Sequence, residues 1–215
     1  MENKVWFTSD IHFGHKNVLR FCTKRREKMG IDIDDPEFDD KHRLYLIDQW
    51  NKTISKKDTV YILGDFSFYN REGTRRILEK LNGKKHLILG NHDKSCKGLE
   101  NYFESVSQIK TVDFKKHEYE FLDENFIVEM CHFPIYSWNR RQHGVCHIHG
   151  HTHGSMCEIN KSSKELRVDV GYDSVLGDLE FISLEKLYNH FKSITGNQTF
   201  RNYINKKMED DGYRL

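Results

Sequence analysis

The sequence predicts an α/β fold in which sheets pack on each other and helices cover their outer faces. Short apolar runs alternate with helix-like segments in the N-terminal half, and strand patterns dominate the C-terminal half. The 215 residues include two prolines and show no internal repeat or linker. We therefore expect one domain over residues 1–195, with residues 196–215 as a surface helix or tail of the same domain.

Apolar patterns in the N-terminal half predict three strands joined by helices. Pro36 suits the first turn of a long helix, in which Leu44, Ile47 and Trp50 mark the inner face. Gly83 is expected to cap the last helix of this half. The predicted strands cover residues 4–9, 59–63 and 86–89, the predicted helices cover residues 16–23, 36–54 and 72–81, and the charged residues 24–40 are expected to form a solvated loop.

The C-terminal half is expected to consist mainly of strands. Alternation of apolar and polar residues at 106–114 and 118–122 predicts a β-hairpin. The run Lys161-Ser162-Ser163 is expected in a polar loop between two strands. Further strands are predicted at residues 126–131, 145–149, 165–170 and 179–183, followed by a helix at residues 184–194.

The composition limits the classes of partner. Lys and Arg total 34 against 33 for Asp and Glu, so the net charge of +1 gives no bulk electrostatic reason to bind nucleic acid or a membrane. No apolar run approaches the ~20 residues of a membrane span, and the N-terminus lacks the apolar core of a signal peptide. The five cysteines are scattered without a CxxC pair, which favours a cytoplasmic protein with reduced thiols.

Asp, His or Asn side chains, which can bind metal ions, follow five of the predicted strands. The most informative stretch is residues 87–93, where an apolar run ends at Gly90 and Asn91, His92 and Asp93 follow at once. Ligands of open α/β sheets bind at the carboxyl ends of strands. The other four strand ends carry Asp10 with His12, Asp65, His132, and His151 with His153.

These residue types suit a pair of metal ions. Two cations about 3.5–4 Å apart need a bridging group such as a carboxylate, and each needs further ligands while leaving room for water and phosphate. Neutral imidazole favours Mn, Fe, Zn or Ni over Mg or Ca. His92 can donate a proton to a leaving oxygen, and Asp93 can orient it. The seven candidate ligands are Asp10, His12, Asp65, Asn91, His132, His151 and His153.

The order Asp-x-His, Gly-Asp, Gly-Asn-His-Asp, His, Gly-His-x-His resembles the calcineurin-like metallophosphoesterases, in particular their small single-domain bacterial and phage members. All five blocks are present between residues 10 and 153. The resemblance implies a four-layer α/β/β/α sandwich with two facing mixed sheets. It implies one metal held by Asp10, His12, Asp65 and His153, and a second held by Asp65, Asn91, His132 and His151.

The resemblance also implies chemistry. It gives His92, supported by Asp93, the role of proton donor or transition-state stabiliser. We expect a phosphatase or phosphodiesterase with two divalent ions, manganese first and Fe, Zn or Ni as alternatives, in which a hydroxide between the metals attacks phosphorus. Phe66 follows Gly64-Asp65 where phosphoprotein phosphatases continue Asp-Arg-Gly, which argues against a protein phosphatase.

Aromatic residues near the metal-binding blocks suggest nucleotides, cyclic nucleotides or other small phosphoesters as substrates, because such rings can stack on a base. His15, Arg140 and Arg141 are candidate substrate-binding residues, since an arginine can grip a phosphate with two hydrogen bonds. The aromatic residues are Phe13, Phe68, Tyr69, Phe133, Tyr136 and Trp138.

Other polar residues are expected to be structural. His147 and His149 share the alternate spacing of His151 and His153 but lie within the preceding strand, so they are expected in the core or behind the ligands. The run 24–26 of Lys and Arg is expected on a solvated face.

Two rival functions stay open. One is a nuclease of the same fold that acts on DNA or RNA, which the neutral net charge does not favour. The other is a scaffold that has lost its metals, against which the intact ligand set argues. The sequence leaves the oligomeric state open.

Overall fold

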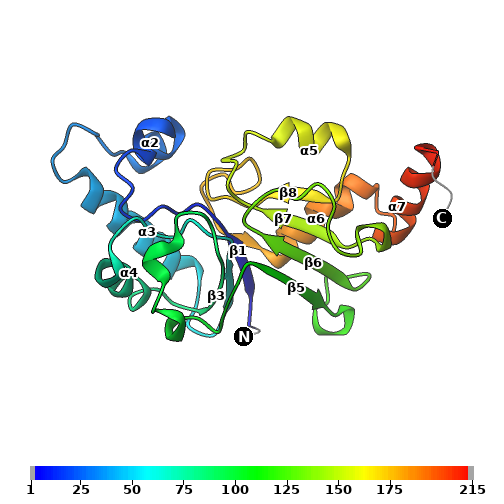
Figure 1. Ribbon diagram of the computed structural model, residues 1–215, viewed down its shortest axis with the longest axis horizontal. Coiled ribbons are helices and arrows are strands. Elements are labelled where there is room, and N and C mark those ends of the chain that lie inside the picture. The colour runs from blue at the N-terminus through cyan, green and yellow to red at the C-terminus, as the bar shows by residue number, and fades with distance from the viewer. Residues whose placement is uncertain (1–2, 213–215) are drawn as a thin grey trace.

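The computed structural model describes residues 3–212, and within these residues two mixed sheets face each other (Figure 1). The five-stranded sheet has the order β4-β3-β2-β1-β9, with β1 at Val5–Thr8, β2 at Thr59–Ile62, β3 at Lys84–Ile88, β4 at Ser105–Ser107 and β9 at Ile182–Ser183. The four-stranded sheet has the order β5-β6-β7-β8, with β5 at Ile109–Phe114, β6 at Phe126–Cys131, β7 at Cys146–His149 and β8 at Arg167–Asp169.

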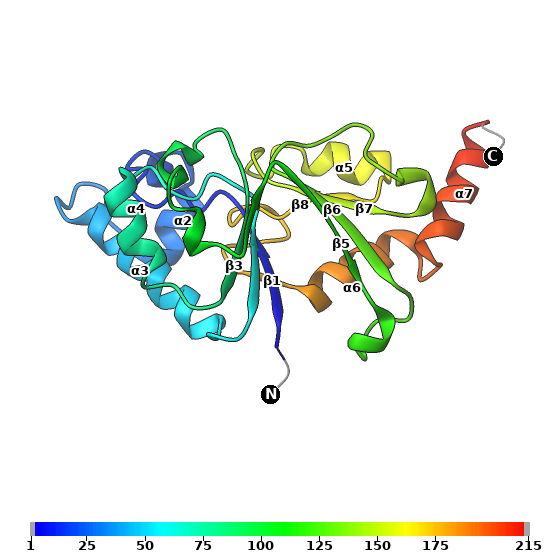
Figure 2. The same cartoon turned by 60° about the horizontal axis from the view of Figure 1, so that its bottom comes forward.

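Helices cover the outer face of the five-stranded sheet. In both views α3 (Phe38–Thr53) and α4 (Arg71–Leu78) lie on the side of this sheet away from the second one (Figures 1 and 2). Trp50 is fully buried there and belongs to one apolar cluster with Val60 and Leu87. Strands β1 to β4 run parallel and β9 pairs antiparallel with β1.

The space between the sheets holds the second apolar cluster. Phe7 and Leu63 from the first sheet pack there with Val128 and Ile148 from the second. Helices α6 (Leu184–Thr195) and α7 (Phe200–Asp210) add their apolar faces to this cluster, and α5 (Cys157–Ser163) lies against β8. The predicted fold of two facing mixed sheets flanked by helices is confirmed.

The expected solvated loop at residues 24–40 is only partly a loop. Helix α1 (Val18–Phe21) is followed at once by α2 (Thr23–Met29), which ends at Gly30 with a φ of 61°. Arg25 of α2 is fully buried, so the prediction of a solvated face was wrong at this residue. Its neighbours Lys24 and Arg26 are more exposed. Because all three residues are basic, the sequence does not show which of them is buried.

The predicted inner face of the long helix was also wrong in part. Leu44 is 55% exposed, whereas His42, Leu46 and Trp50 are buried. These three residues recur every four positions and form the buried stripe of α3. Leu44 therefore lies on the exposed face of α3, and its apolar side chain did not identify the buried face.

Several elements differ from the prediction. Helix α4 ends at Leu78, and Gly83 instead lies in the turn before β3 with a φ of 88°. The expected hairpin does not form, because β4 pairs with β3 and β5 pairs with β6. Residues 118–122 contain no strand, and their alternation reflects Tyr119 and Phe121, which pack against the core. Residues 161–163 belong to α5 and not to a loop.

The segment after residue 195 contains α7, which Thr199 caps by accepting a hydrogen bond from the backbone of Asn202. Residues 213–215 of this segment lie outside the described residues. None of the helices within residues 3–212 has the length and apolar character required to span a bilayer.

Candidate metal centre

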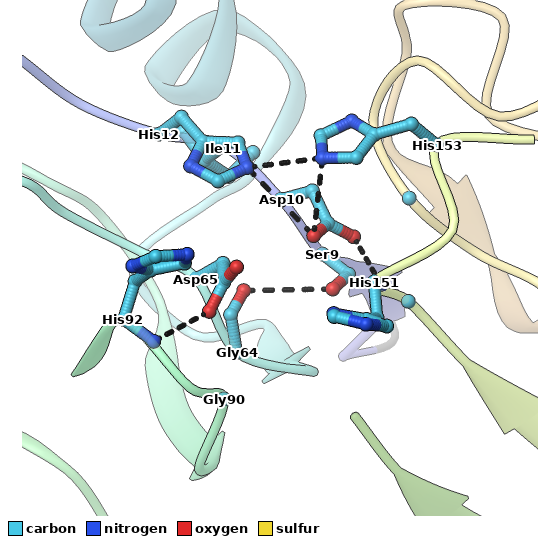
Figure 3. A network of polar contacts seen from close by, with 12 residues as sticks. Ser9, Asp10, Ile11, His12, Gly64, Asp65, Gly90, His92, His151 and His153 are labelled. Carbon is cyan, nitrogen blue, oxygen red and sulfur yellow. Dashed lines mark hydrogen bonds and ion pairs between the residues drawn. The ribbon is translucent and has the colours of Figure 1, made fainter. Parts of the chain in front are cut away.

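The five motifs come together at the carboxyl ends of β1, β2, β3, β6 and β7. Figure 3 shows the motif residues that follow β1, β2, β3 and β7. Two groups of three side chains each place one nitrogen or oxygen atom per residue within 4.8 Å of the others. The β1 triad consists of Asp10, His12 and His153, and the β2 triad consists of Asp65, His132 and His151.

The β1 triad has the spacing of a metal site. His12 Nε2 lies 3.2 Å from His153 Nε2, and each nitrogen lies 3.8 Å from Asp10 Oδ1. Two atoms bound at about 2.0–2.2 Å to one ion are at most about 4.4 Å apart. All three distances therefore allow these atoms to share one cation.

The burial of Asp10 and His12 also fits a cation between them. Asp10 Oδ1 is buried without a hydrogen-bond partner, and burial raises the pKa of this carboxyl to about 8. Burial lowers the pKa of His12 to about 2, so its imidazole is neutral. A buried carboxylate needs a positive partner, and neutral imidazole is the form that binds transition metals.

The β2 triad is oriented by backbone groups. His132 Nδ1 donates to the carbonyl oxygen of Leu63 at 2.7 Å, because that oxygen can only accept. The lone pair of His132 Nε2 is then directed toward Asp65 Oδ1 at 3.5 Å and Asn91 Oδ1 at 3.0 Å. Such a hydrogen bond on the far nitrogen is the usual way in which a protein fixes a metal-binding histidine.

Five of the candidate ligands adopt a left-handed backbone. This conformation is uncommon outside glycine and clusters at functional sites. It turns the chain sharply after each strand, so that neighbouring motif residues reach the same cleft. The φ values are 55° at Asp10, 58° at His12, 51° at Asp65, 68° at His151 and 47° at His153.

Two glycines allow the strand ends to approach each other. A Cβ on Gly150 would lie 1.9 Å from Ser9 Oγ and 2.5 Å from Asp10 Oδ2, and a Cβ on Gly90 would lie 2.4 Å from Asp65 Oδ1. No side chain can be accommodated at these distances. Both motif glycines are therefore required for the carboxylates to sit where they do.

Comparison with known proteins agrees with this geometry. The sequence model of the calcineurin-like phosphoesterases matches residues 3–155. The chain belongs to the calcineurin-like phosphoesterase family. The four-layer architecture and the order of the motifs are thereby accounted for.

Similar proteins carry no established activity in their names. The chain is 29% identical over 195 residues to the gene 66 protein of Mycobacterium phage L5, covering 80% of this chain and 87% of that one. It is 28% identical over 192 residues to an uncharacterized protein of Methanocaldococcus jannaschii, covering 85% and 92%. A protein of unknown function from Aquifex aeolicus, AQ665, has a similar fold with a TM-score of 0.60 at 21% identity, covering 88% of this chain and all of that one.

Sequence reasoning missed two residues behind the β1 triad of this phosphoesterase. Asp173 accepts a hydrogen bond from His153 Nδ1 at 2.9 Å. Arg25 Nη2 lies 3.2 Å from Asp173 and donates to the carbonyl oxygen of Asp10 at 3.0 Å, while Nη1 donates to that of Ile11 at 2.9 Å. Asp173 follows the β8 strand, so the same strand-end signal could have found it. No local pattern distinguishes Arg25 from its charged neighbours.

The Arg25–Asp173–His153 chain has clear electrostatic effects. Burial alone would raise the pKa of Asp173, but the hydrogen bond from His153 and the charge of Arg25 lower it to about 2. The same hydrogen bond raises the pKa of His153. Because Asp173 occupies Nδ1, the Nε2 atom of His153 faces Asp10 and His12.

Asp93 has a different contact from the one expected. Its two carboxylate oxygens accept hydrogen bonds from the backbone N–H groups of Asp65, Phe66 and Gly90 at 2.7–3.0 Å. The expectation that Asp93 orients the imidazole of His92 is therefore replaced, because the carboxylate holds the turn that carries Asp65. The backbone N–H of His92 donates to Asp65 Oδ1 at 3.0 Å, and its ring lies 4.7 Å from the ring of Phe68.

Two members of each triad line one cleft of about 460 Å³, namely His12 and His153 of the β1 triad and Asp65 and His151 of the β2 triad. His15 and Phe68 form a stacked pair on its wall, with ring centroids 4.1 Å apart. Val18 and Phe21 from the first helix line the same wall. Of the aromatic residues near the motifs, Phe68 thus lines the cleft, while Phe13 and Trp138 are buried and Tyr136 is 91% exposed.

The two candidate arginines do not reach this cleft. Arg141 makes two hydrogen bonds to the carboxylate of Glu165, at 2.6 and 2.9 Å, and neither Arg140 nor Arg141 lines the cavity. His147 and His149 are fully buried in β7, and both rings bond to backbone carbonyl groups. These two histidines therefore belong to the core, as expected.

Proposed function

We propose that the protein hydrolyses phosphoesters with two divalent transition-metal ions in the cleft. Membership in the calcineurin-like phosphoesterase family supports a metal-dependent hydrolase. The observation that carries the dinuclear proposal is the presence of two separate ligand triads, each of which contributes two residues to the lining of one cleft.

The two triads supply most of the proposed ligands. Asp10, His12 and His153 would hold one ion, and Asp65 would contribute to both. The bound ions supply Lewis-acid chemistry, which activates water and offsets charge on the phosphoryl oxygens. The second ion would be held by Asp65, Asn91, His132 and His151. The imidazole ligands favour Mn, Fe, Zn or Ni.

The proposed proton donor is His92. Its side chain is exposed to the cleft, while its backbone N–H is anchored on Asp65. In its protonated form the imidazole can donate to the leaving oxygen or to a charged phosphoryl oxygen. Phe68 packs beside this ring and restricts its position.

The proposed substrates are small phosphoesters, with nucleotides and cyclic nucleotides first. The cleft volume suits a small molecule, and the exposed ring of Phe68 offers one surface for a base. Within the described residues, Phe68 is the member of the six aromatic candidates that lines this cleft.

A phosphoester panel tests the proposal. The purified protein would be assayed on linear and cyclic, mono- and diester substrates with Mn, Fe, Zn, Ni and Mg. We expect hydrolysis of small phosphoesters that depends on a transition metal and falls sharply in His92→Ala, which should still bind metal. Degradation of labelled oligonucleotides without action on mononucleotides would instead identify a nuclease. Metal binding without hydrolysis of any phosphoester would refute the enzymatic role.

A further inference from the structure

A second cavity, of about 600 Å³, lies between α5, β8, α6 and α7. Within the described residues it shares no lining residue with the metal cleft. Its volume lies within the roughly 300–1,000 Å³ of small-molecule sites. Side chains that define its character are Lys161, Lys164, Arg167, Leu176, Ile194 and Tyr203.

The charge of this cavity is positive. Three cationic side chains line it, against one carboxylate, that of Asp169. The oxygens of Asp169 are already used, because they accept hydrogen bonds from Thr152 Oγ1 and from the backbone N–H groups of Gly154 and Gly171. With three cationic side chains against one carboxylate, the cavity lining carries a net positive charge.

Arg167 is the strongest indication of an anionic ligand. It is 6% exposed, yet no carboxylate of the described residues lies within 4.0 Å of its guanidinium. Its Nε donates to Asn160 Oδ1 at 2.8 Å and its Nη1 to the carbonyl oxygen of Ile135 at 3.0 Å, and its Nη2 has no hydrogen-bond partner within the described part of the chain. Buried guanidinium groups are normally paired with an anion.

The opposite wall of the cavity is apolar. Leu176 and Ile194 line it, and Val175 at its edge is 68% exposed. Tyr203 Oη donates to the carbonyl oxygen of Lys164 at 2.9 Å, which ties α7 to the end of α5. The lining of the cavity thus includes both cationic and apolar side chains, and the contact between Tyr203 and Lys164 joins two of the helices around it.

We propose that this cavity binds a small organic anion that carries an apolar group. The anionic head lies against Arg167, Lys161 and Lys164, and the apolar body packs on Leu176 and Ile194. The site lies close to the metal-binding loop, because Asp169 lines the cavity and also holds Gly154, the residue after His153.

Titration of the full chain with 8-anilinonaphthalene-1-sulfonate, an aromatic sulfonate that fluoresces in apolar sites, tests this proposal. We expect saturable binding with one site per chain. N-phenyl-1-naphthylamine, which lacks the sulfonate, should bind at least about tenfold more weakly, because it forgoes the charge-assisted contacts. Equal affinity for the two probes would show an apolar patch and would overturn the proposal.

Variants locate the site. The double variant Lys161→Gln/Lys164→Gln changes surface residues and should weaken sulfonate binding about five- to tenfold, and Arg167→Met should weaken it further. Lys56→Gln/Lys57→Gln makes the same charge change on a distant exposed turn and should leave binding unchanged. Circular dichroism would confirm that each variant is folded.

Three outcomes contradict the proposal. The first is an absence of saturable binding. The second is binding that survives the Lys161→Gln/Lys164→Gln change but is lost in Phe68→Ala, which would place the probe in the metal cleft. The third is concentration-dependent self-association that excludes the probe, which light scattering would detect and which would make the cavity an interface between copies of the chain.

Discussion

The two triads of the metal cleft are supported in different ways. The β1 triad depends on a chain of charged side chains, in which Arg25 of α2 contacts Asp173 and Asp173 contacts His153. In the β2 triad, His132 is instead oriented by a backbone group, the carbonyl oxygen of Leu63. Replacing side chains should therefore disturb the β1 site more selectively than the β2 site.

The kind of partner that orients each triad determines how sensitive that triad is to substitution. A backbone partner persists whatever the neighbouring side chains are, so the orientation of His132 does not depend on a charged side chain. The β1 site adds a short helical segment, α2, whose buried arginine has no other charged partner within the described residues than Asp173. The strongest test of the comparison removes the group that both sites are proposed to share.

Asp65→Asn should have the largest effect. The amide cannot supply the negative charge that two adjacent cations require. We expect loss of both ions and a fall in turnover of about 10⁴-fold or more, in line with loss of an entire catalytic unit. Metal analysis of the purified variant measures the first effect and a phosphoester assay the second. Retention of two tightly bound ions would contradict the shared role of Asp65.

His92→Ala should leave both triads intact and reduce only the reaction. Removal of a general acid lowers turnover by about 10²–10⁴-fold. Because His92 belongs to neither triad, metal stoichiometry should equal that of the native protein. Full activity in this variant would refute the role of His92 in proton transfer.

Asp173→Asn should separate the two sites. Groups that orient a metal-binding histidine typically contribute 10–100-fold in metal affinity. We expect one of two ions to bind about 10–100-fold more weakly in calorimetric titrations, while the other is unchanged. Asp178→Asn, at an exposed position of the same loop, serves as the matched control. Equal weakening of both ions would show that the triads are not supported independently.

Buried histidines outside the ligand set include one in helix α3 and one in strand β7. Burial lowers the pKa of His42 in α3 and of His147 in β7 from 6.5 to about 3. The unfolded chain takes up protons below about pH 6.5, whereas the folded protein does not until about pH 3. Each histidine should therefore lower the free energy of unfolding by up to about 1.4 kcal/mol per pH unit as the pH falls through this range.

Urea unfolding at pH 7.5 and pH 5 measures this loss. His147→Gln should reduce the difference between the two pH values, and replacing the exposed His117 by Gln should not. An unchanged pH dependence in His147→Gln would show that this histidine does not titrate on unfolding.

The sequence predicted those parts of the site that follow strands. Asp10, Asp65, Asn91, His132, His151 and His153 each come shortly after an apolar run, and topology then brings strand ends together. The sequence could not predict contacts that depend on tertiary packing. Arg25 lies in a charged run, and only the folded chain shows that its guanidinium binds the carbonyl groups of residues 10 and 11.

The role of Asp93 illustrates the same limit. Its position beside His92 favoured a contact between neighbouring side chains, but the sharp turn directs the carboxylate back to three backbone N–H groups. Arg140 and Arg141 lie between two ligand motifs in sequence, yet the loop carries Arg141 to Glu165. The position of a residue directly after a strand predicted its place in the site, whereas the position of a residue within a loop did not predict its contacts.

Anomalous diffraction from manganese-soaked crystals tests the dinuclear centre most directly. We expect two peaks about 3.5–4 Å apart, one beside His12 and His153, the other beside His132 and His151, with the Asp65 carboxylate touching both. A single peak, or two peaks of which Asp65 contacts only one, would contradict the shared centre.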